Sequence, residues 1–309
     1  MDATLQKYGF EALGTHCGVQ VYETSRVDAK NLVRRIAAEI VRIDRKYSAS
    51  RRDSFTTEIN FSAGSKLGIK LDKETQELLQ RLQRHHESSE GLFDPTVNLL
   101  RRVWDFKKPR MASPEEIEKL LPRVGFHKLS WRGARFSLPA GTELDFSSTL
   151  GAYAADCAAG VGRGLGITSG IVNVAGDYAV IGPHPKSLTW PVGIADPERQ
   201  NALLGKLEIG SGGLASSGDY NGSIELEGQH YQRLINPKTG MPASGLRAVS
   251  MIAKTCFDAA ALAEIAMLKD ADEAISWLET MPESHAYMTH AGELHGKGLQ
   301  PIKTASPAA

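Results

Sequence analysis

Residue types that can hold an anionic group gather in one stretch of this chain, Leu144 to Gly182. Ser147-Ser148-Thr149 opens an expected helix of small residues, and an apolar strand at 170–174 leads to Asp177. The exposed first turn of a helix offers free backbone N–H groups and a positive dipole end, which suit a phosphate. Small side chains let a ligand or another backbone approach closely. The alternative is a tightly packed Ala/Gly helix against a sheet.

Hydrophobic periodicity and capping patterns predict helices and strands around that stretch. A strand over 8–23 is interrupted at Gly14-Thr15, and Asp72 begins a helix that Gly91 ends. His85 and His86 look exposed on it and, as helix neighbours, point to different faces, which argues against a metal pair. The other expected helices cover 28–47, 113–124, 255–267 and 270–280. Strands are expected at 67–69, 189–195, 203–214 and 249–253, with two or three short strands over 126–145 and a hairpin over 224–235.

Neither a repeat nor a linker divides the chain, so this mixture predicts one α+β domain over 1–309 with a continuous core. The last residues, from about 303 to 309, are expected to form a frayed tail.

Composition narrows the classes of function. The 309 residues carry 36 basic and 36 acidic side chains, so the zero net charge removes the electrostatic argument for nucleic acid or an anionic membrane. Cys17, Cys157 and Cys256 are widely spaced and predict packed thiols, with neither a disulfide framework nor a zinc site. We expect no membrane span. The N-terminus lacks a signal-peptide pattern, which favours the cytoplasm, or the periplasm if a leader has been removed.

Taken together, the motifs resemble the ApbE-like FAD:protein FMN transferases over about Leu13 to Leu278. The segment 145–156 resembles the family's Asp-Leu-Gly-Gly-Ile-Ala-Lys-Gly-Tyr-Ala-x-Asp, and 173–177 resembles its Asn-x-Gly-Gly-Asp. The other matching segments are Gly14-Thr15, Tyr47-Ser48 through Asp53-Ser54 to Ile59-Asn60, Gly91-Leu-Phe-Asp94-Pro-Thr-Val97 with the following Trp104, Ser216-Ser-Gly-Asp-Tyr220, Asn236-Pro-Lys-Thr-Gly240 and Asp258-Ala-Ala-Ala-Leu262, the last compared with Asp-Ala-Leu-Ala-Thr.

This resemblance implies a two-lobed, T-fold-like α/β fold with a ligand cleft between the lobes. It implies transfer of FMN from FAD to a Thr or Ser of an acceptor protein, with Mg²⁺ bound and AMP released. The magnesium ligands would be the carbonyl of Thr149 and Asp258, and the catalytic residues Arg233 and Asp258. The implied FAD-binding residues are Gly14, Thr15, Ser54, Asn60, Phe93, Asp94, Asp145, Tyr153, Asp156, Ala175, Gly176, Asp177, Ser217, Gly218, Asp219, Tyr220, Pro237, Thr239 and Gly240.

The chain departs from the family at three positions of the site. Leu150 is assigned to the family's Lys, Arg233 to its His, and Leu262 to the Thr that helps hold Mg²⁺. Arginine cannot act as a base at neutral pH, although it can neutralise a phosphate. Loss of a general base costs about 10²–10⁴-fold in rate, and loss of one hydroxyl ligand weakens a magnesium site without abolishing it.

Other interpretations remain open at these positions. Asp258 lies three residues after Thr255, which is a capping pattern, so it could cap a helix, bind metal or do both. Asp94, Asp177 and Asp219 are turn formers by default.

One alternative to the implied transferase function is that the chain is a non-catalytic FAD-binding paralogue. Another is a pocket re-purposed for a different anionic ligand with Arg233 as its anchor. The acceptor would be a protein such as a respiratory flavoprotein subunit with a Ser/Thr-Gly-Ala-Thr-type motif.

Overall fold

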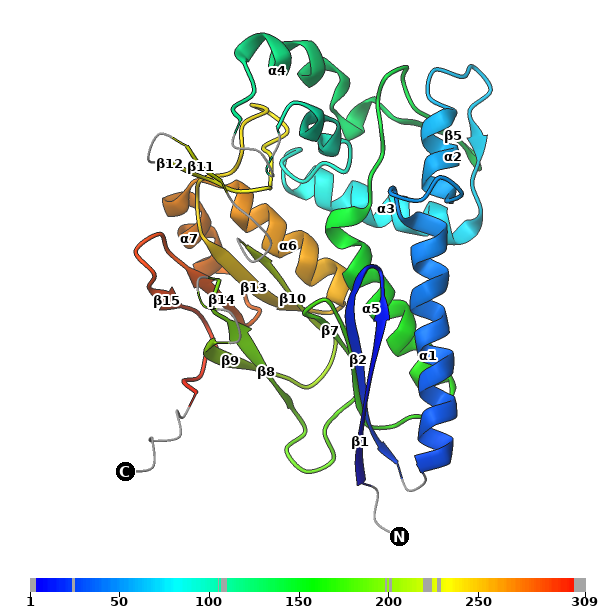
Figure 1. The fold of residues 1–309 in the computed structure, drawn as a ribbon, viewed down its shortest axis with the longest axis vertical. Coiled ribbons are helices and arrows are strands. Elements are labelled where there is room, and N and C mark those ends of the chain that lie inside the picture. The colour runs from blue at the N-terminus through cyan, green and yellow to red at the C-terminus, as the bar shows by residue number, and fades with distance from the viewer. Residues whose placement is uncertain are drawn as a thin grey trace.

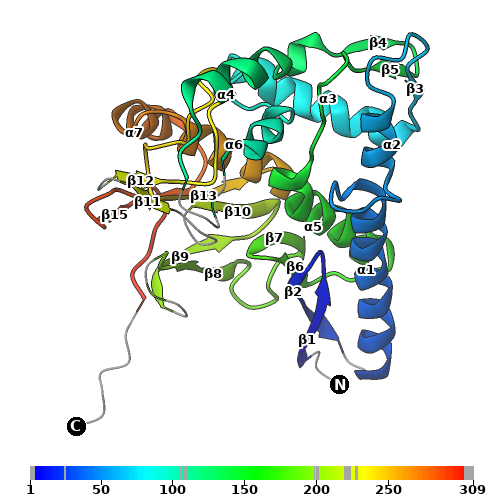
Figure 2. The same cartoon turned by 45° about the horizontal axis from the view of Figure 1, so that its top comes forward.

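The fold has a layered lower lobe, built on a large sheet, and a smaller upper lobe of helices and short strands (Figures 1 and 2). The structure is a computed structural model and describes residues 4–23, 26–104, 106, 110–197, 199, 202–218, 224–226 and 229–302. The expected tail at 303–309 lies outside these residues. Within them, no helix combines the length and apolar character needed to cross a membrane.

The lower lobe is organised around an eight-stranded sheet in the order β1-β2-β6-β7-β10-β13-β14-β15. Each neighbouring pair is antiparallel, from the β1–β2 hairpin at one edge to the β14–β15 pair at the other. The strands are Thr4–Ala12 (β1), Thr15–Glu23 (β2), Gly170–Val174 (β6), Asp177–Gly182 (β7), Gly213–Gly218 (β10), Ala248–Ala253 (β13), His285–Met288 (β14) and Leu294–His295 (β15).

Three helices cover one face of this sheet side by side: α1 (Arg26–Tyr47), α5 (Ser147–Gly164) and α6 (Cys256–Leu268) (Figure 1). The helix expected over 28–47 is confirmed as α1, and its residues Ile36, Ile40 and Ile43 form a fully buried apolar stripe. The small residues of α5 permit close packing against both α1 and α6. Helix α7 (Ala271–Thr280) follows α6, and the hairpin of β8 (Trp190–Ala195) and β9 (Leu203–Ile209) packs its apolar residues on the sheet strands β6, β7 and β10.

The upper lobe is the segment between α1 and α5. It contains α2 (Phe55–Phe61), β3 (Ile69–Lys70), α3 (Lys73–Ser88), the 3₁₀ turns η1 (Val97–Arg102), η2 (Leu121–Arg123) and η3 (Phe126–Lys128), α4 (Pro114–Leu120), β4 (Ser130–Arg132) and β5 (Arg135–Ser137). Asp72 and Ser113 cap α3 and α4 as expected. A small hairpin of β11 (Ile224–Leu226) and β12 (Gln229–Tyr231) lies later in the chain.

Several sequence expectations need correction. The strand at 203–214 is two strands, β9 and β10, and the strands β14 and β15 were not anticipated. His86 is buried and its Nδ1 lies 2.9 Å from the carbonyl oxygen of Phe93, while His85 is paired with Asp258. The expected exposure of both histidines was therefore wrong. The three cysteines are free thiols, as predicted.

Candidate active-site cleft between the lobes

A polar cleft lies where α5 begins, and it has two hollows that share Ser147, Ser148 and Asp177. The outer hollow, of about 600 Å³, is also lined by Leu13, Gly14, Thr15, Asp44, Ser48, Ser50, Arg51, Leu150, Gly151, Val174 and Ala175. The inner hollow, of about 240 Å³, is also lined by Arg101, Ser216, Ser217, Leu234, Ala260 and Glu264. The cleft thus brings together the predicted residues Gly14, Thr15, Ala175, Asp177 and Ser217.

Two tight hairpin turns form one wall of the outer hollow. Leu13-Gly14 joins β1 to β2, and Ala175-Gly176 joins β6 to β7, with all four φ angles between 55° and 95°. Positive φ at both central residues is the geometry that continues the twist of a two-residue hairpin. The amide N of Ala175 donates to the His16 carbonyl at 3.4 Å, so the turns lie side by side. The glycines leave their side of the cleft open, since a Cβ on Gly14 or Gly176 would meet nothing within 4 Å.

The amino-terminal turn of α5 forms the floor of the cleft. Asp145 fixes it, because one carboxylate oxygen accepts the Ser147 N–H at 2.7 Å and the other accepts the Asn98 amide at 2.7 Å. Asn60 exchanges two hydrogen bonds with the main chain of Leu144, at 2.8 and 2.9 Å. Asp145 and Asn60 therefore position this turn, and the exposed Ser147 and Ser148 present it to the cleft.

Charges of both signs surround the inner hollow. Burial raises the pKa of Asp177 to about 7, although it accepts a main-chain hydrogen bond from Ser216. Burial also raises the pKa of Glu264 to about 7, against a hydrogen bond from the Ser148 hydroxyl. Loss of hydration lowers the pKa of Arg101, and the charges of Asp145, Arg233 and Glu264 act on it as well. Arg233 therefore lies near enough to affect Arg101, but it lines neither hollow of the cleft, and its assignment to the site stays a prediction.

One face of helix α6 lines the cleft and another faces α3. The predicted metal ligand Asp258 lies on the face towards α3. Ala260 and Glu264 line the cleft. Asp258 instead faces α3, where its Oδ1 lies 2.9 Å from Nε2 of His85 and its Oδ2 accepts the Thr255 hydroxyl at 2.6 Å. These partners lower the pKa of Asp258 to about 2, against the effect of burial. Thr255 caps α6 by accepting the Asp258 N–H, so Asp258 belongs to the helix cap.

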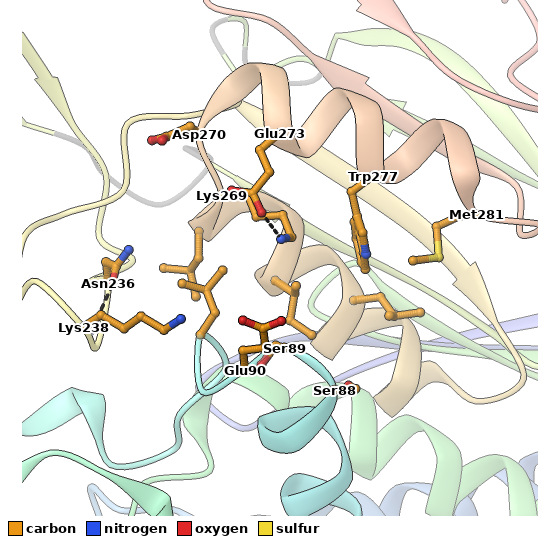
Figure 3. Close-up of a pocket in the computed structure, with 14 residues that line it drawn as sticks. Ser88, Ser89, Glu90, Asn236, Lys238, Lys269, Asp270, Glu273, Trp277 and Met281 are labelled. Carbon is orange, nitrogen blue, oxygen red and sulfur yellow. Dashed lines mark hydrogen bonds and ion pairs between the residues drawn. The ribbon is translucent and has the colours of Figure 1, made fainter.

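Leu262 lies one turn beyond Asp258 and lines a separate pocket of about 550 Å³ (Figure 3). That pocket lies between α7, the end of α3 and the turn at Asn236 and Lys238, and its Lys269 is paired with Glu273 at 2.5 Å. Asp258 and Leu262 therefore do not reach the cleft, and magnesium does not fit at Thr149 and Asp258. Thr149 itself is buried in the first turn of α5.

These positions change how two motifs of this chain align with the family's motifs. When the family's Ala-Leu-Ala is aligned with residues 261–263, its Asp falls on Ala260 and its Thr falls on Glu264. These are the two α6 residues that line the cleft. A position-by-position count of 145–156 likewise moves the family's Lys from Leu150 to Gly151. A Cβ on Gly151 would lie 3.2 Å from Oδ2 of Asp177, so this position also faces the cleft.

Several predicted FAD-binding residues stabilise turns instead. Asp94 is buried, with Oδ1 accepting the N–H and hydroxyl of Thr96 at 2.8 and 2.5 Å and Oδ2 accepting the Phe126 N–H at 2.8 Å. Phe93 lies in the core beside it. Ser54 is the cap of α2 and accepts the N–H of Thr57.

The same holds for two residues on α5. The carboxylate of Asp156 accepts the N–H groups of Cys256 and Phe257, at 2.8 and 3.0 Å, and so binds the start of α6. Tyr153 is buried in the core and its hydroxyl donates to Glu74 at 3.3 Å. Neither side chain lines the cleft.

The predicted turn at 236–240 lies against the upper lobe. Gly240 donates to the Asn236 carbonyl at 2.8 Å and accepts the Trp104 indole N–H at 2.9 Å. Pro237 is buried, and the Thr239 hydroxyl accepts the N–H of Met241 at 3.2 Å. Gly218 ends β10 against Ala248, while Asp219 and Tyr220 lie outside the described residues.

Sequence reasoning missed several residues that line the cleft, above all Glu264, Arg101 and Arg51. The sequence could have indicated Glu264, because it is the single charged residue between Asp258 and Lys269 in an otherwise apolar stretch. Arg51 and Arg101 carried none, since each stands in a stretch with other charged residues.

Fold and site together define a mixed α/β protein with a polar cleft between two lobes. The ApbE family profile matches residues 13–288, so the chain belongs to the ApbE family. It is 25% identical to the FAD:protein FMN transferase of Treponema pallidum, over 87% of this chain and 80% of that protein. It is 27% identical to the enzyme of that name from Salmonella typhimurium, over 81% and 74%.

Solved structures agree with this assignment. The ApbE protein of Thermotoga maritima superposes with a TM-score of 0.85 at 26% identity, covering 94% of this chain and 96% of that one. The flavinyl transferase ApbE of Pseudomonas stutzeri gives 0.81 at 24% identity, covering 98% and 95%. These likenesses confirm the predicted α+β, two-lobed fold class.

Proposed function

We propose that this chain is an FAD:protein FMN transferase, which moves FMN from FAD to a Ser or Thr hydroxyl of an acceptor protein and releases AMP. The observation that carries the proposal is the cleft itself, in a chain whose relatives bear that name. It joins the amino-terminal turn of α5 to two open hairpin turns and is bordered by Arg51 and Arg101.

The reaction exchanges the phosphoanhydride bond of FAD for a phosphoester bond to the acceptor. The acceptor oxygen attacks the phosphorus of the FMN half, the bond to the AMP half breaks, and AMP leaves with the bridging oxygen. Such a transfer depends on holding the two oxygens in line and on neutralising charge on the phosphates. Magnesium, when bound, supplies part of that neutralisation.

The residues of this chain supply the rest. The N–H groups and dipole at the start of α5 attract the diphosphate. Arg101 adds a fixed positive charge at the inner hollow, and Arg233 acts on the same region. Since an arginine stays protonated at neutral pH, Arg233 stabilises charge and does not remove the proton of the acceptor.

The test is an incubation of the purified chain with FAD and Mg²⁺, with and without an acceptor protein, in which AMP and FMN are followed by chromatography. Acceptor-dependent AMP without free FMN is the expected result. AMP together with free FMN in the absence of acceptor would indicate a pyrophosphatase instead. Bound but intact FAD would indicate a non-catalytic flavin-binding protein, and no FAD binding would indicate another anionic ligand.

A further inference from the structure

Glu264 is an unusual residue for its place in the fold. It lies in the middle of α6 between apolar residues, is 5% exposed, and lines the inner hollow of the cleft. Burying an ionised carboxylate is costly unless a cation or several hydrogen bonds compensate it. An acid at this position therefore needs a partner that the helix itself does not provide.

The groups around Glu264 form a set of oxygen donors. The Ser148 hydroxyl donates to it, and the same hollow contains Asp177, Ser147, Ser216 and Ser217. Both carboxylates have a pKa of about 7, because burial removes water from each of them. Mg²⁺ prefers carboxylate and other oxygen ligands and retains several waters. The donor set of the hollow therefore fits a hard divalent cation, whereas Asp258 is already paired with His85.

The corrected alignment of α6 with the family's motif relates Glu264 to a metal-binding position. Ala260 stands where the family's Asp would be, and Glu264 stands at its Thr, one turn further along the same face of α6. Residues four apart on a helix have Cβ atoms about 5–6 Å from each other. The longer Glu side chain can thus present its carboxylate to the space that Ala260 leaves open.

We propose that Glu264 is the α6 ligand of the magnesium ion in this chain, so that the carboxylate has moved by one helical turn from the family's Asp position. The ion would lie in the inner hollow, which Asp177 also lines. This inference rests on the proposed function for the identity of the metal. The competing explanation is that Glu264 only balances the charge of Arg101, whose pKa it affects.

The test measures Mn²⁺ and Mg²⁺ binding to the full chain by titration calorimetry, without FAD or acceptor. Glu264→Gln keeps the size of the side chain and removes the charge, and we expect it to weaken metal affinity at least about tenfold. Asp258→Asn is the matched control on the other face of α6, and its affinity is expected to stay within about twofold of the unchanged protein. Equal affinity in Glu264→Gln and the unchanged protein would overturn the proposal, as would a selective loss in Asp258→Asn.

A double substitution distinguishes whether Glu264 is a metal ligand or a structural acid. Glu264→Thr should lose affinity, and Ala260→Asp combined with Glu264→Thr should regain most of it, because the carboxylate returns one turn earlier on the same face. If the double variant is folded by circular dichroism but still fails to bind Mn²⁺, the ligand assignment is wrong. These measurements involve no turnover. The ligand proposal can therefore fail while AMP release supports the proposed function, and the proposed function can fail while Glu264 is shown to bind metal.

Discussion

Replacing Asp156 tests whether this carboxylate stabilises the fold or binds the substrate. Its oxygens accept the N–H groups of Cys256 and Phe257 at 2.8 and 3.0 Å. A hydrogen bond to a charged group contributes about 1.5–3 kcal/mol, so the two together contribute about 3–6 kcal/mol before any offset. Burial raises the pKa of Asp156, which offsets part of this gain. We therefore expect Asp156→Ala to lower the free energy of unfolding by about 2–4 kcal/mol.

Asp156→Asn is the matched control, because its amide keeps one acceptor oxygen and should cost about half as much. The assay is urea denaturation at pH 7, followed by circular dichroism, together with FAD titration under native conditions. We expect the folded variants to bind FAD as the unchanged protein does. A loss of stability below about 0.5 kcal/mol for Asp156→Ala, or loss of FAD binding in a folded variant, would refute this reasoning.

Three further changes test other parts of the structure. Arg42 and Lys46 lower the pKa of Glu74 to about 2, so the stability it adds is present above its ordinary pKa of 4.5 and is lost as the pH falls towards 2. Glu74→Gln should therefore cost about 1–2 kcal/mol at pH 7 and flatten acid denaturation between these two values; an unchanged acid profile would contradict this. Gly240→Ala should lower the unfolding free energy by about 2–3 kcal/mol, measured in urea, because φ is +74° and a Cβ would strike Ile117. Tyr153→Phe removes a hydroxyl that bonds to Glu74 at 3.3 Å and also to Cys157, neither of which lines the cleft. FAD affinity by fluorescence titration should therefore not change, and a loss of about tenfold would show that Tyr153 contributes to FAD binding.

Local signals in the sequence were sufficient for much of the fold. Asp72, Ser113 and Thr255 act within one turn of their own helices, so their capping roles could be predicted from neighbouring residues. The stripe of α1 follows from its period in the same way. Strands β14 and β15 could not be found in this way, because β14 is buried at all four residues and so does not alternate, and β15 has only two residues. Their pairing follows from the position of β13.

The site was predicted less well than the fold, and the reason lies in α6. Asp258 and Ala260 are two residues apart and differ in direction by about 200° around a helix, so an error of two in motif register exchanges one face for the other. Only the positions of α3 and α5 show that Asp258 meets His85 while Glu264 faces Ser148. Acids in the motifs, such as Asp94 and Asp156, also bind main-chain N–H groups from distant segments, which no local pattern reveals.

The most direct test of the proposed transferase activity is mass spectrometry of an acceptor protein after a single turnover with this chain, FAD and Mg²⁺. The account predicts FMN attached through a phosphoester to one Ser or Thr of the acceptor, with AMP released in equal amount. An unmodified acceptor, recovered beside intact FAD or beside free FMN, would contradict it.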